Sequence, residues 1–226
     1  MDTEPRQKPD KLAELVAALV QAARSLAAAQ LVTGTAGNLS ARDGDLIAVT
    51  ATGARLSRLE PRHVTVVSLD GAVVGGDLAP TSELALHLEI YRRYRPSAVV
   101  HAHPPVATAL GCVLEELPCI HPDMLDLGGP VRVSGYETFG SQAFAEATAR
   151  ALDGRHAVLM SNHGTLAVGD TPEQAAERTR LLEWVAGLYW RAAAIGTPRV
   201  LSGEQQQQLR DTITRIGYGR LHPLGS

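Results

Sequence analysis

The sequence predicts an α/β protein, because helix-like and strand-like segments follow one another along 226 residues. Apolar side chains recur at spacings of three and four over residues 10–29, which is typical of an amphipathic helix. Small and β-branched residues fill the run 98–102, which is typical of a buried strand. The length is ample for one hydrophobic core. We therefore expect a single domain over residues 1–226, with residues 1–8 disordered.

Composition excludes several classes of partner. The chain is 45% hydrophobic and 20% charged, which is ordinary for a folded globular protein. Its net charge of -3 provides no basic field for a nucleic acid or an anionic membrane surface. We expect neither as a partner, and any anion-binding site must be local.

The cysteines and the N-terminus indicate a cytoplasmic protein. Cys112 and Cys119 are too few for a disulfide framework and fit a reducing compartment. The N-terminus is charged and lacks the order of regions in a signal peptide. No stretch approaches the roughly 18 apolar residues of a membrane span.

The remaining patterns predict further elements in chain order. Helices are expected at 83–93, 106–113, 141–152, 170–194 and from 205 onward. Strands are expected at 46–50, 63–69, 72–74, 119–121, 157–160 and 165–169. Residues 43–45 and 70–71 are hairpin turn signals, and 122–130 is expected to be an irregular loop.

The strand run 98–102 leads into two histidines, His101 and His103. Successive side chains on a strand alternate faces, so these two imidazoles point the same way and can converge on a metal ion. Pro104 and Pro105 stop the strand because neither can donate to a sheet ladder. A histidine pair at a strand end is as often merely structural, so the pair is a weak signal by itself.

Two other polar motifs strengthen the metal hypothesis. Residues 81–83 end in Glu83, and residues 161–164 contain His163; both flank apolar runs and look like turns at element ends. Three histidines and one carboxylate from three elements would leave an exchangeable position, which is the layout of a catalytic zinc. His87 lies four residues after Glu83, but we expect it to face the core or solvent rather than a metal.

The stretch 34–42 contains two glycines and an asparagine, which permit positive φ and close approach of backbone amides to a ligand. It predicts an anion-binding nest or, alternatively, a plain turn between helix and strand. Residues 51–53 form a second small, hydroxyl-bearing turn.

Five motifs in this order resemble the zinc-dependent class II aldolase/adducin family, over about residues 10–220. They are Gly-Thr-Ala-Gly-Asn-Leu-Ser at 34–40, Thr-Ala-Thr-Gly at 50–53, Pro-Thr-Ser-Glu at 80–83, Val-Val-His-Ala-His at 99–103 and Asn-His-Gly at 162–164. The resemblance implies an α/β/α sandwich with a mostly antiparallel central sheet, assembled as a fourfold-symmetric homotetramer with active sites near subunit interfaces.

The resemblance also implies roles for individual residues. His101, His103 and His163 would hold one Zn2+ per chain, and Glu83 would be the acid/base that also approaches the metal when substrate is absent. The substrate phosphate would be bound by Gly37, Asn38, Thr52, Gly53, Thr81 and Ser82.

One loop departs from the family pattern. The family's aldolase carries a tyrosine after the histidine equivalent to His121, where it donates a proton into a neighbouring subunit; here that position is Pro122. Asp123 or Asp126 would have to replace the phenol, or the reaction differs. The family's C-terminal tyrosine and its aromatic on the aldehyde side recur as Tyr218 and Phe139.

The function that follows is a zinc-dependent aldolase, which cleaves a ketose 1-phosphate of the L-fuculose 1-phosphate kind to dihydroxyacetone phosphate and an aldehyde. Two sibling reactions stay open: 4-epimerisation of a pentulose phosphate, and dehydration of methylthioribulose 1-phosphate. A third alternative is a non-catalytic scaffold like the adducin branch. That branch lacks the histidine set, so the three histidines argue against it.

Overall fold

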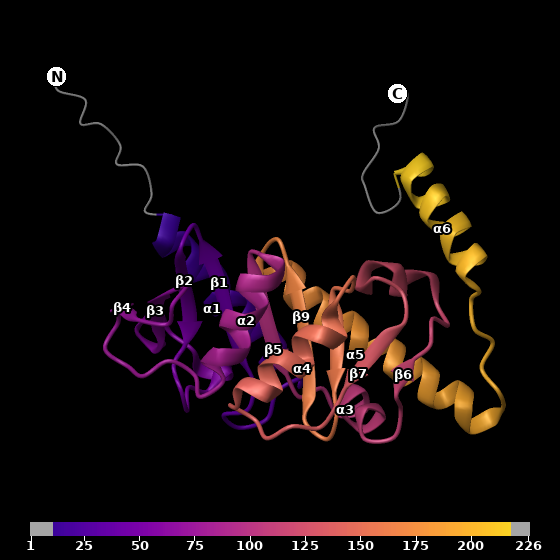
Figure 1. Ribbon diagram of the computed structural model, residues 1–226, viewed down its shortest axis with the longest axis horizontal. Helices are drawn as coiled ribbons and strands as arrows, with labels where there is room; N and C mark the ends of the chain where they lie inside the picture. The colour runs from indigo at the N-terminus through magenta and orange to yellow at the C-terminus, as the bar shows by residue number, and fades with distance from the viewer. Residues whose placement is uncertain (1–10, 218–226) are drawn as a thin grey trace.

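The structure is a computed structural model that describes residues 11–217 (Figure 1). Residues 1–8, predicted to be disordered, lie outside the described residues. The helices are α1 (Lys11–Ala28), α2 (Leu84–Tyr94), α3 (Pro105–Gly111), α4 (Gln142–Leu152), α5 (Pro172–Ile195) and α6 (Gly203–Ile216). The strands are β1 (Asn38–Asp43), β2 (Leu46–Thr50), β3 (Val64–Ser68), β4 (Val73–Gly75), β5 (Ala98–Ala102), β6 (Glu116–Leu117), β7 (Val131–Ser134), β8 (Ala157–Met160) and β9 (Gly164–Gly169).

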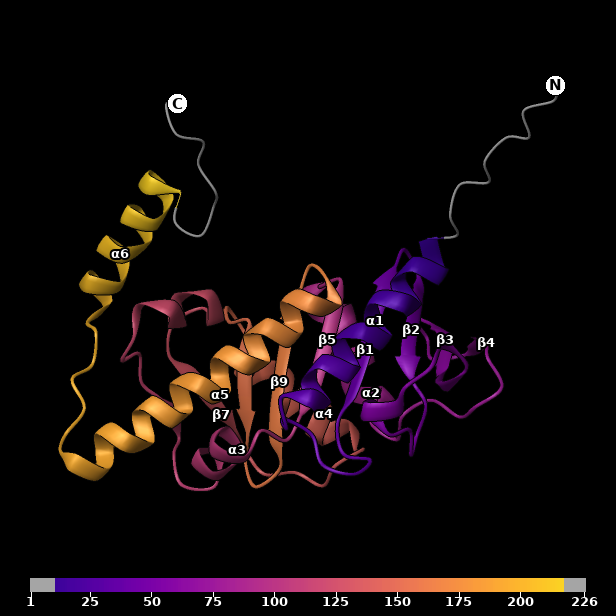
Figure 2. The same ribbon diagram turned by 180° about the vertical axis from the view of Figure 1, so that it is seen from behind.

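The strands form one nine-stranded sheet in the order β4-β3-β2-β1-β5-β9-β8-β7-β6. Neighbouring strands are antiparallel throughout except for the parallel pair β7 and β8. Helices α2 and α4 cover one face (Figure 1), and α1 and α5 cover the other, as the view from behind shows (Figure 2). The predicted α/β/α sandwich with a mostly antiparallel sheet is confirmed.

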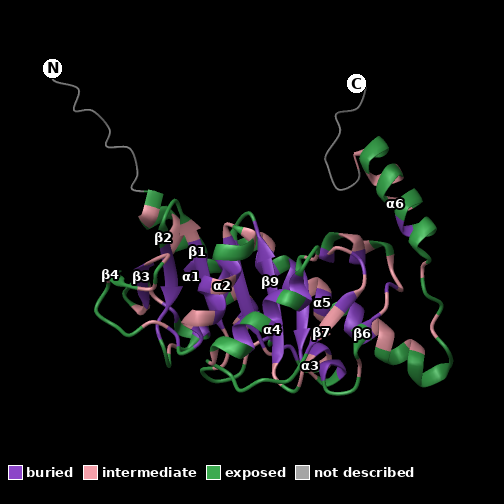
Figure 3. Cartoon of the chain, in the orientation of Figure 1, coloured by how far each residue is buried: buried purple, intermediate pink, exposed green. Residues whose placement is uncertain are grey.

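Alternation along the central strands divides their side chains between the two faces. Leu39 and Val100 belong to the core cluster beneath α1. Val99 lies in the cluster beneath α2 and α4, so Ser40, its register partner on β1, faces α2 as well. The sheet is buried along its centre, whereas α6 extends away from the body and is mostly exposed (Figure 3).

The region between α3 and α4 differs from its prediction. The strand expected at 119–121 is wrong: the strand is β6, at Glu116–Leu117, and residues 122–127 form a short 3-10 helix with Pro122 in its first turn. Strand β7 was not predicted. It has only four residues, of which Arg132 and Ser134 are polar, so its apolar signal is too short to separate from a loop.

Among residues 11–217, no helix combines the length and the apolar character needed to cross a membrane.

Candidate active site

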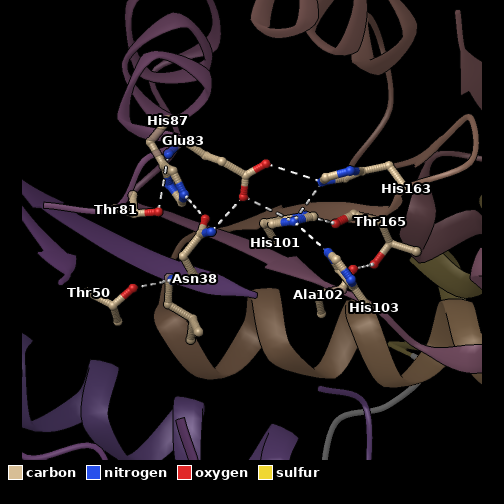
Figure 4. A network of polar contacts seen from close by, with 11 residues as sticks. Asn38, Thr50, Thr81, Glu83, His87, His101, Ala102, His103, His163 and Thr165 are labelled. Carbon is tan, nitrogen blue, oxygen red and sulfur yellow. Dashed lines mark hydrogen bonds and ion pairs between the residues drawn. The ribbon is translucent and has the colours of Figure 1, made fainter. Parts of the chain in front are cut away.

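The predicted ligands meet where β1 and β5 lie side by side (Figure 4). Asn38 is paired directly with His101 in the register of the two strands. His103 follows the end of β5, and His163 lies in the turn between β8 and β9. Glu83 precedes α2 and reaches the same point from the helix layer. Residues from four segments thus converge on one end of the sheet.

Two glycines permit this convergence. A Cβ on Gly164 would lie 2.5 Å from the carbonyl oxygen of Ala102 and 2.8 Å from the His103 ring, so β9 can approach the histidine strand only without a side chain. Gly37 has a φ of +82°, and a Cβ there would lie 2.9 Å from the carbonyl oxygen of His101. Gly37 thus has the positive φ that the 34–42 stretch was expected to permit, but the close approach seen is to the backbone of His101, and the expected approach to an anion stays a prediction.

The ring nitrogens form a tight cluster. Nε2 of His101 lies 3.0 Å from Nε2 of His103 and 3.2 Å from Nε2 of His163. The Glu83 carboxylate completes the group, with Oε2 3.2 Å from His101 Nε2 and Oε1 3.2 Å from His163 Nε2. Each of the three histidines offers one ring nitrogen as a metal ligand, and these three atoms lie within 4.8 Å of one another.

The protonation of His101 is set by its second nitrogen. Its Nδ1 lies 2.9 Å from the carbonyl oxygen of Thr165, which can only accept, so Nδ1 is the donor and Nε2 presents a lone pair to the cluster. Burial lowers the pKa of His101, and burial together with the neighbouring rings lowers the pKa of His103 to about 4. These imidazoles are neutral at pH 7, as metal ligands must be.

This donor set fits a divalent metal ion. Tetrahedral ligands at zinc–nitrogen distances of about 2.0–2.1 Å are separated from one another by roughly 3.3 Å. The two spacings measured from His101 Nε2, 3.0 Å to His103 and 3.2 Å to His163, are close to that value. The lone pair of His101 Nε2 and the buried Glu83 carboxylate make this site electron-rich, and a cation would stabilise it. His101, His103 and His163 can therefore hold a metal, with Glu83 beside it.

Glu83 occupies the N-cap position of α2, which begins at Leu84 rather than at the expected residue 83, yet its carboxylate makes no capping bond. Its backbone N–H donates to Thr81 Oγ1, and Asn38 Nδ2 donates to Oε2 at 2.7 Å. Burial raises the pKa of the Glu83 carboxyl, but its contacts with His163, His101 and Asn38 outweigh burial and hold that pKa well below its ordinary value. The Glu83 carboxyl is thus ionised and is able to accept a proton.

A cavity of about 510 Å³ opens beside this cluster. It is lined by all six residues expected to bind phosphate, Gly37, Asn38, Thr52, Gly53, Thr81 and Ser82, together with Glu83, His103, Phe139 and His163. Within the described part of the chain, no lysine or arginine lines it. An anion here would be held by amides and hydroxyls, as the sequence predicted for a local anion site.

Neither acidic residue of the 122–130 loop reaches the cavity of its own chain. Asp123 is half-exposed, 3.7 Å from Nδ1 of His121, and Asp126 pairs with Arg178 at 3.1 Å; neither lines the cavity. A catalytic role for Asp123 would need a second subunit and stays a prediction. Tyr218, the other expected donor, lies outside the described residues.

Three buried residues behind Asn38 make contacts that sequence patterns did not predict, although His87 lies in the core, one of the two positions expected for it. His87 is fully buried and faces Asn38, and Ser40 and Tyr91 continue the contacts away from the cavity. The available signal was spacing, because Glu83, His87 and Tyr91 follow one another every four residues along α2 and share one helix face.

Comparison with known proteins agrees with this geometry. The family profile described as the class II aldolase and adducin N-terminal domain matches residues 17–190. The chain belongs to this family. Class II aldolases use a divalent metal ion, and the expectation that this chain is an enzyme of that type is confirmed.

Three class II aldolase relatives illustrate the range of the family. A 5-deoxy-D-ribulose 1-phosphate aldolase of Bacillus thuringiensis is 32% identical over 205 residues, covering 89% of this chain and 95% of the relative. A 3-oxo-tetronate 4-phosphate decarboxylase of Haemophilus influenzae is 34% identical over 202 residues, covering 86% and 91%. A solved L-fuculose 1-phosphate aldolase superposes with a TM-score of 0.85 at 33% identity, covering 89% and 96%.

Proposed function

We propose that this protein is a zinc-dependent aldolase that cleaves a ketose 1-phosphate to dihydroxyacetone phosphate and an aldehyde. One observation carries the proposal: three histidine ring nitrogens and an ionised carboxylate lie together at the edge of a cavity whose other walls offer amide and hydroxyl donors. Relatives named as aldolases of 5-deoxy-D-ribulose 1-phosphate and L-fuculose 1-phosphate support this class of substrate.

The reaction breaks the C3–C4 bond of the ketose. The C4 hydroxyl loses its proton, C4 leaves as an aldehyde, and the bonding electron pair passes to C3 and the C2 oxygen as an enediolate. A proton added at C3 then yields dihydroxyacetone phosphate. A divalent metal held by His101, His103 and His163 supplies Lewis-acid stabilisation of negative charge on oxygen.

The chain's own residues orient the substrate and move the proton. Thr52, Thr81 and Ser82 offer hydroxyls and Gly53 an amide, which would hold the phosphate and use remote binding energy to place C2–C4. Glu83 would exchange the proton at C3, since it is ionised and lies at the edge of the cavity beside His163.

We further propose a cytoplasmic homotetramer with active sites near subunit interfaces. Trp184 and Trp190 on α5 are about half-exposed, and Val113 beyond α3 is 76% exposed. Exposed large apolar side chains of this kind are typical of surfaces that a partner covers. Light scattering after size exclusion would measure the mass; a monomer would contradict this assembly.

A second candidate, favoured by the Haemophilus influenzae relative, is decarboxylation of a 3-oxo acid phosphate. The electron flow is the same: the bond to the carboxylate carbon breaks, CO2 leaves, and the electron pair passes toward the carbonyl oxygen. The cavity's chemistry serves both reactions, so they differ only in the group that leaves.

A substrate panel tests these functions. The zinc-loaded protein would be incubated with L-fuculose 1-phosphate, 5-deoxyribulose 1-phosphate, methylthioribulose 1-phosphate and 3-oxo-tetronate 4-phosphate. Dihydroxyacetone phosphate formed together with an aldehyde from a ketose 1-phosphate supports the aldolase. Decarboxylation of 3-oxo-tetronate 4-phosphate also leaves dihydroxyacetone phosphate, so release of CO2 from that substrate, with no aldehyde formed from the ketose phosphates, identifies the decarboxylase. Loss of water or a change of configuration identifies a sibling reaction. Turnover of no ketose phosphate would contradict the proposal.

A further inference from the structure

A buried ladder of hydrogen bonds runs from the candidate base into the layer between β1 and α2. Glu83, His87 and Tyr91 project from one face of α2, and Asn38 and Ser40 project from one face of β1. The two sets alternate along the ladder, in the order Glu83, Asn38, His87, Ser40, Tyr91. The end nearest the cavity is visible in Figure 4.

The chemistry of each group fixes the direction of the bonds. Asn38 Nδ2 donates to Glu83 Oε2 at 2.7 Å, so Asn38 Oδ1 is the atom that faces His87, at 2.5 Å from Nε2. A carbonyl oxygen only accepts, so His87 carries its proton on Nε2 and its Nδ1 accepts from Ser40 Oγ at 2.6 Å. Ser40 Oγ in turn accepts from the Tyr91 hydroxyl at 2.8 Å. Every donor points toward the carboxylate.

His87 and Tyr91 are both fully buried, with no exposed surface. Burial lowers the pKa of His87 to about 3, so the imidazole is neutral and has one donor and one acceptor. Both are used in the ladder, and neither reaches the histidine cluster. His87 therefore bonds Asn38 on one side and Ser40 on the other, and neither ring nitrogen is left to bind a ligand.

We propose that His87, supported by Ser40 and Tyr91, is a positioning residue that fixes the orientation of the Asn38 amide so that its NH2 group faces the Glu83 carboxylate. This role rests on the proposed function of Glu83 as the base. An asparagine amide has nearly the same shape in its two flipped orientations, and only its partners decide between them. The Nε2–H of His87 admits only the acceptor Oδ1.

The consequence concerns the geometry of the base. Without the His87 donor, the amide can turn and present Oδ1 to the ionised carboxylate, where two acceptors repel each other. Glu83 then loses the hydrogen bond that Asn38 Nδ2 donates to its Oε2 and can leave the orientation in which it faces the cavity. The histidine ligands keep their own contacts, so metal binding would persist.

Steady-state kinetics test the positioning role of His87, with the substrate that the wild-type protein turns over fastest in the panel described above. His87→Leu fills the space without a donor, and we expect kcat to fall roughly 10- to 100-fold, the effect of losing a hydrogen bond to a charged group. KM and zinc content should stay near wild type. His87→Gln returns an amide donor toward Asn38 and should recover most of the lost kcat. Ile90→Ala, a buried change on the same helix outside the ladder, controls for loss of stability.

A second measurement does not depend on any substrate. Proton–nitrogen correlation spectra of histidine-labelled protein distinguish the two neutral tautomers, and the signal that disappears in His87→Gln belongs to His87. We expect protonated Nε2 and unprotonated Nδ1 at pH 7. Protonated Nδ1, or a charged ring, would overturn the proposal even if turnover is normal.

The kinetics and the tautomer measurement together distinguish failure of the proposed function from failure of the positioning role of His87. If the panel shows no turnover but His87 is the Nε2–H tautomer, the proposed function fails and the orientation of Asn38 stands. Equal kcat in wild type and His87→Leu would overturn the positioning role. Equal losses of kcat in His87→Leu and Ile90→Ala would also overturn the positioning role, because the loss would then reflect general destabilisation.

Discussion

Asn38 and His101 are register partners on β1 and β5, and both contact the same carboxylate oxygen of Glu83. Oε2 lies 2.7 Å from Asn38 Nδ2 and 3.2 Å from His101 Nε2. Because side chains alternate along a strand, a one-residue slip between the strands would turn one of these groups away from α2. The sheet register therefore sets the geometry of the candidate base.

The first prediction concerns the metal. His163→Ala removes one of three converging nitrogens, and we expect zinc content to fall from about one per chain to a small fraction, because the remaining ligands do not complete a site. Metal analysis after dialysis measures the zinc content per chain. His156→Ala is the control, since that exposed ring contacts the carbonyl of Asp126 away from the cluster. Full zinc content in His163→Ala would refute the three-histidine assignment.

The second prediction concerns Glu83. Glu83→Gln preserves shape and an acceptor for Asn38 but removes the base, so we expect zinc to be retained and kcat to fall by roughly 10²-fold or more. Steady-state kinetics and metal analysis on the same sample measure both. Exposed Glu146→Gln serves as the control. Loss of zinc together with loss of fold would instead identify Glu83 as structural.

The third prediction concerns the phosphate. Thr52→Val and Ser82→Ala each remove one hydroxyl from the cavity wall, and we expect each to raise KM roughly 10-fold, as for one hydrogen bond to a charged group. Thr33→Val changes a threonine of the preceding loop that does not line the cavity, and it should leave KM unchanged. Unchanged KM in both cavity variants would show that the phosphate binds elsewhere.

Local sequence patterns predicted most of this arrangement, and their failures have physical causes. The strand 98–102 and its two histidines follow from alternation and from Pro104, which need no tertiary information. Strand β6 and the 3-10 helix after it depend instead on burial of Cys119 and Met124 in a core built by distant helices. The ladder through His87 needed the packing distance between β1 and α2, which no local pattern contains.

The fourth prediction concerns stability against pH. Burial lowers the pKa of His87 from 6.5 to about 3, so between those values the unfolded chain binds a proton that the folded chain does not. The free energy of unfolding must then decrease as pH falls through this window, by about 1.4 kcal/mol per pH unit for one such group.

His87→Leu removes that contribution, so urea unfolding of the metal-free protein at pH 6.5, 5.5 and 4.5 should give a shallower slope than wild type. Ile90→Ala should lower the free energy of unfolding at every pH and keep the wild-type slope. Parallel curves for wild type and His87→Leu would show that the buried imidazole does not titrate in this way.

The last prediction concerns the loop in which Pro122 replaces the expected tyrosine. Asp126 is held by Arg178. Within residues 11–217, the ion-pair partner of Asp123 is the half-exposed ring of His121, so the Asp123 carboxylate could enter a neighbouring subunit's cavity in the proposed tetramer. We expect Asp123→Asn to lower kcat roughly 10-fold or more, as for a proton donor. Asp126→Asn should lower only thermal stability, through the lost ion pair. Near-normal turnover in Asp123→Asn with a large loss in Tyr218→Phe would assign proton donation to the C-terminal tyrosine instead.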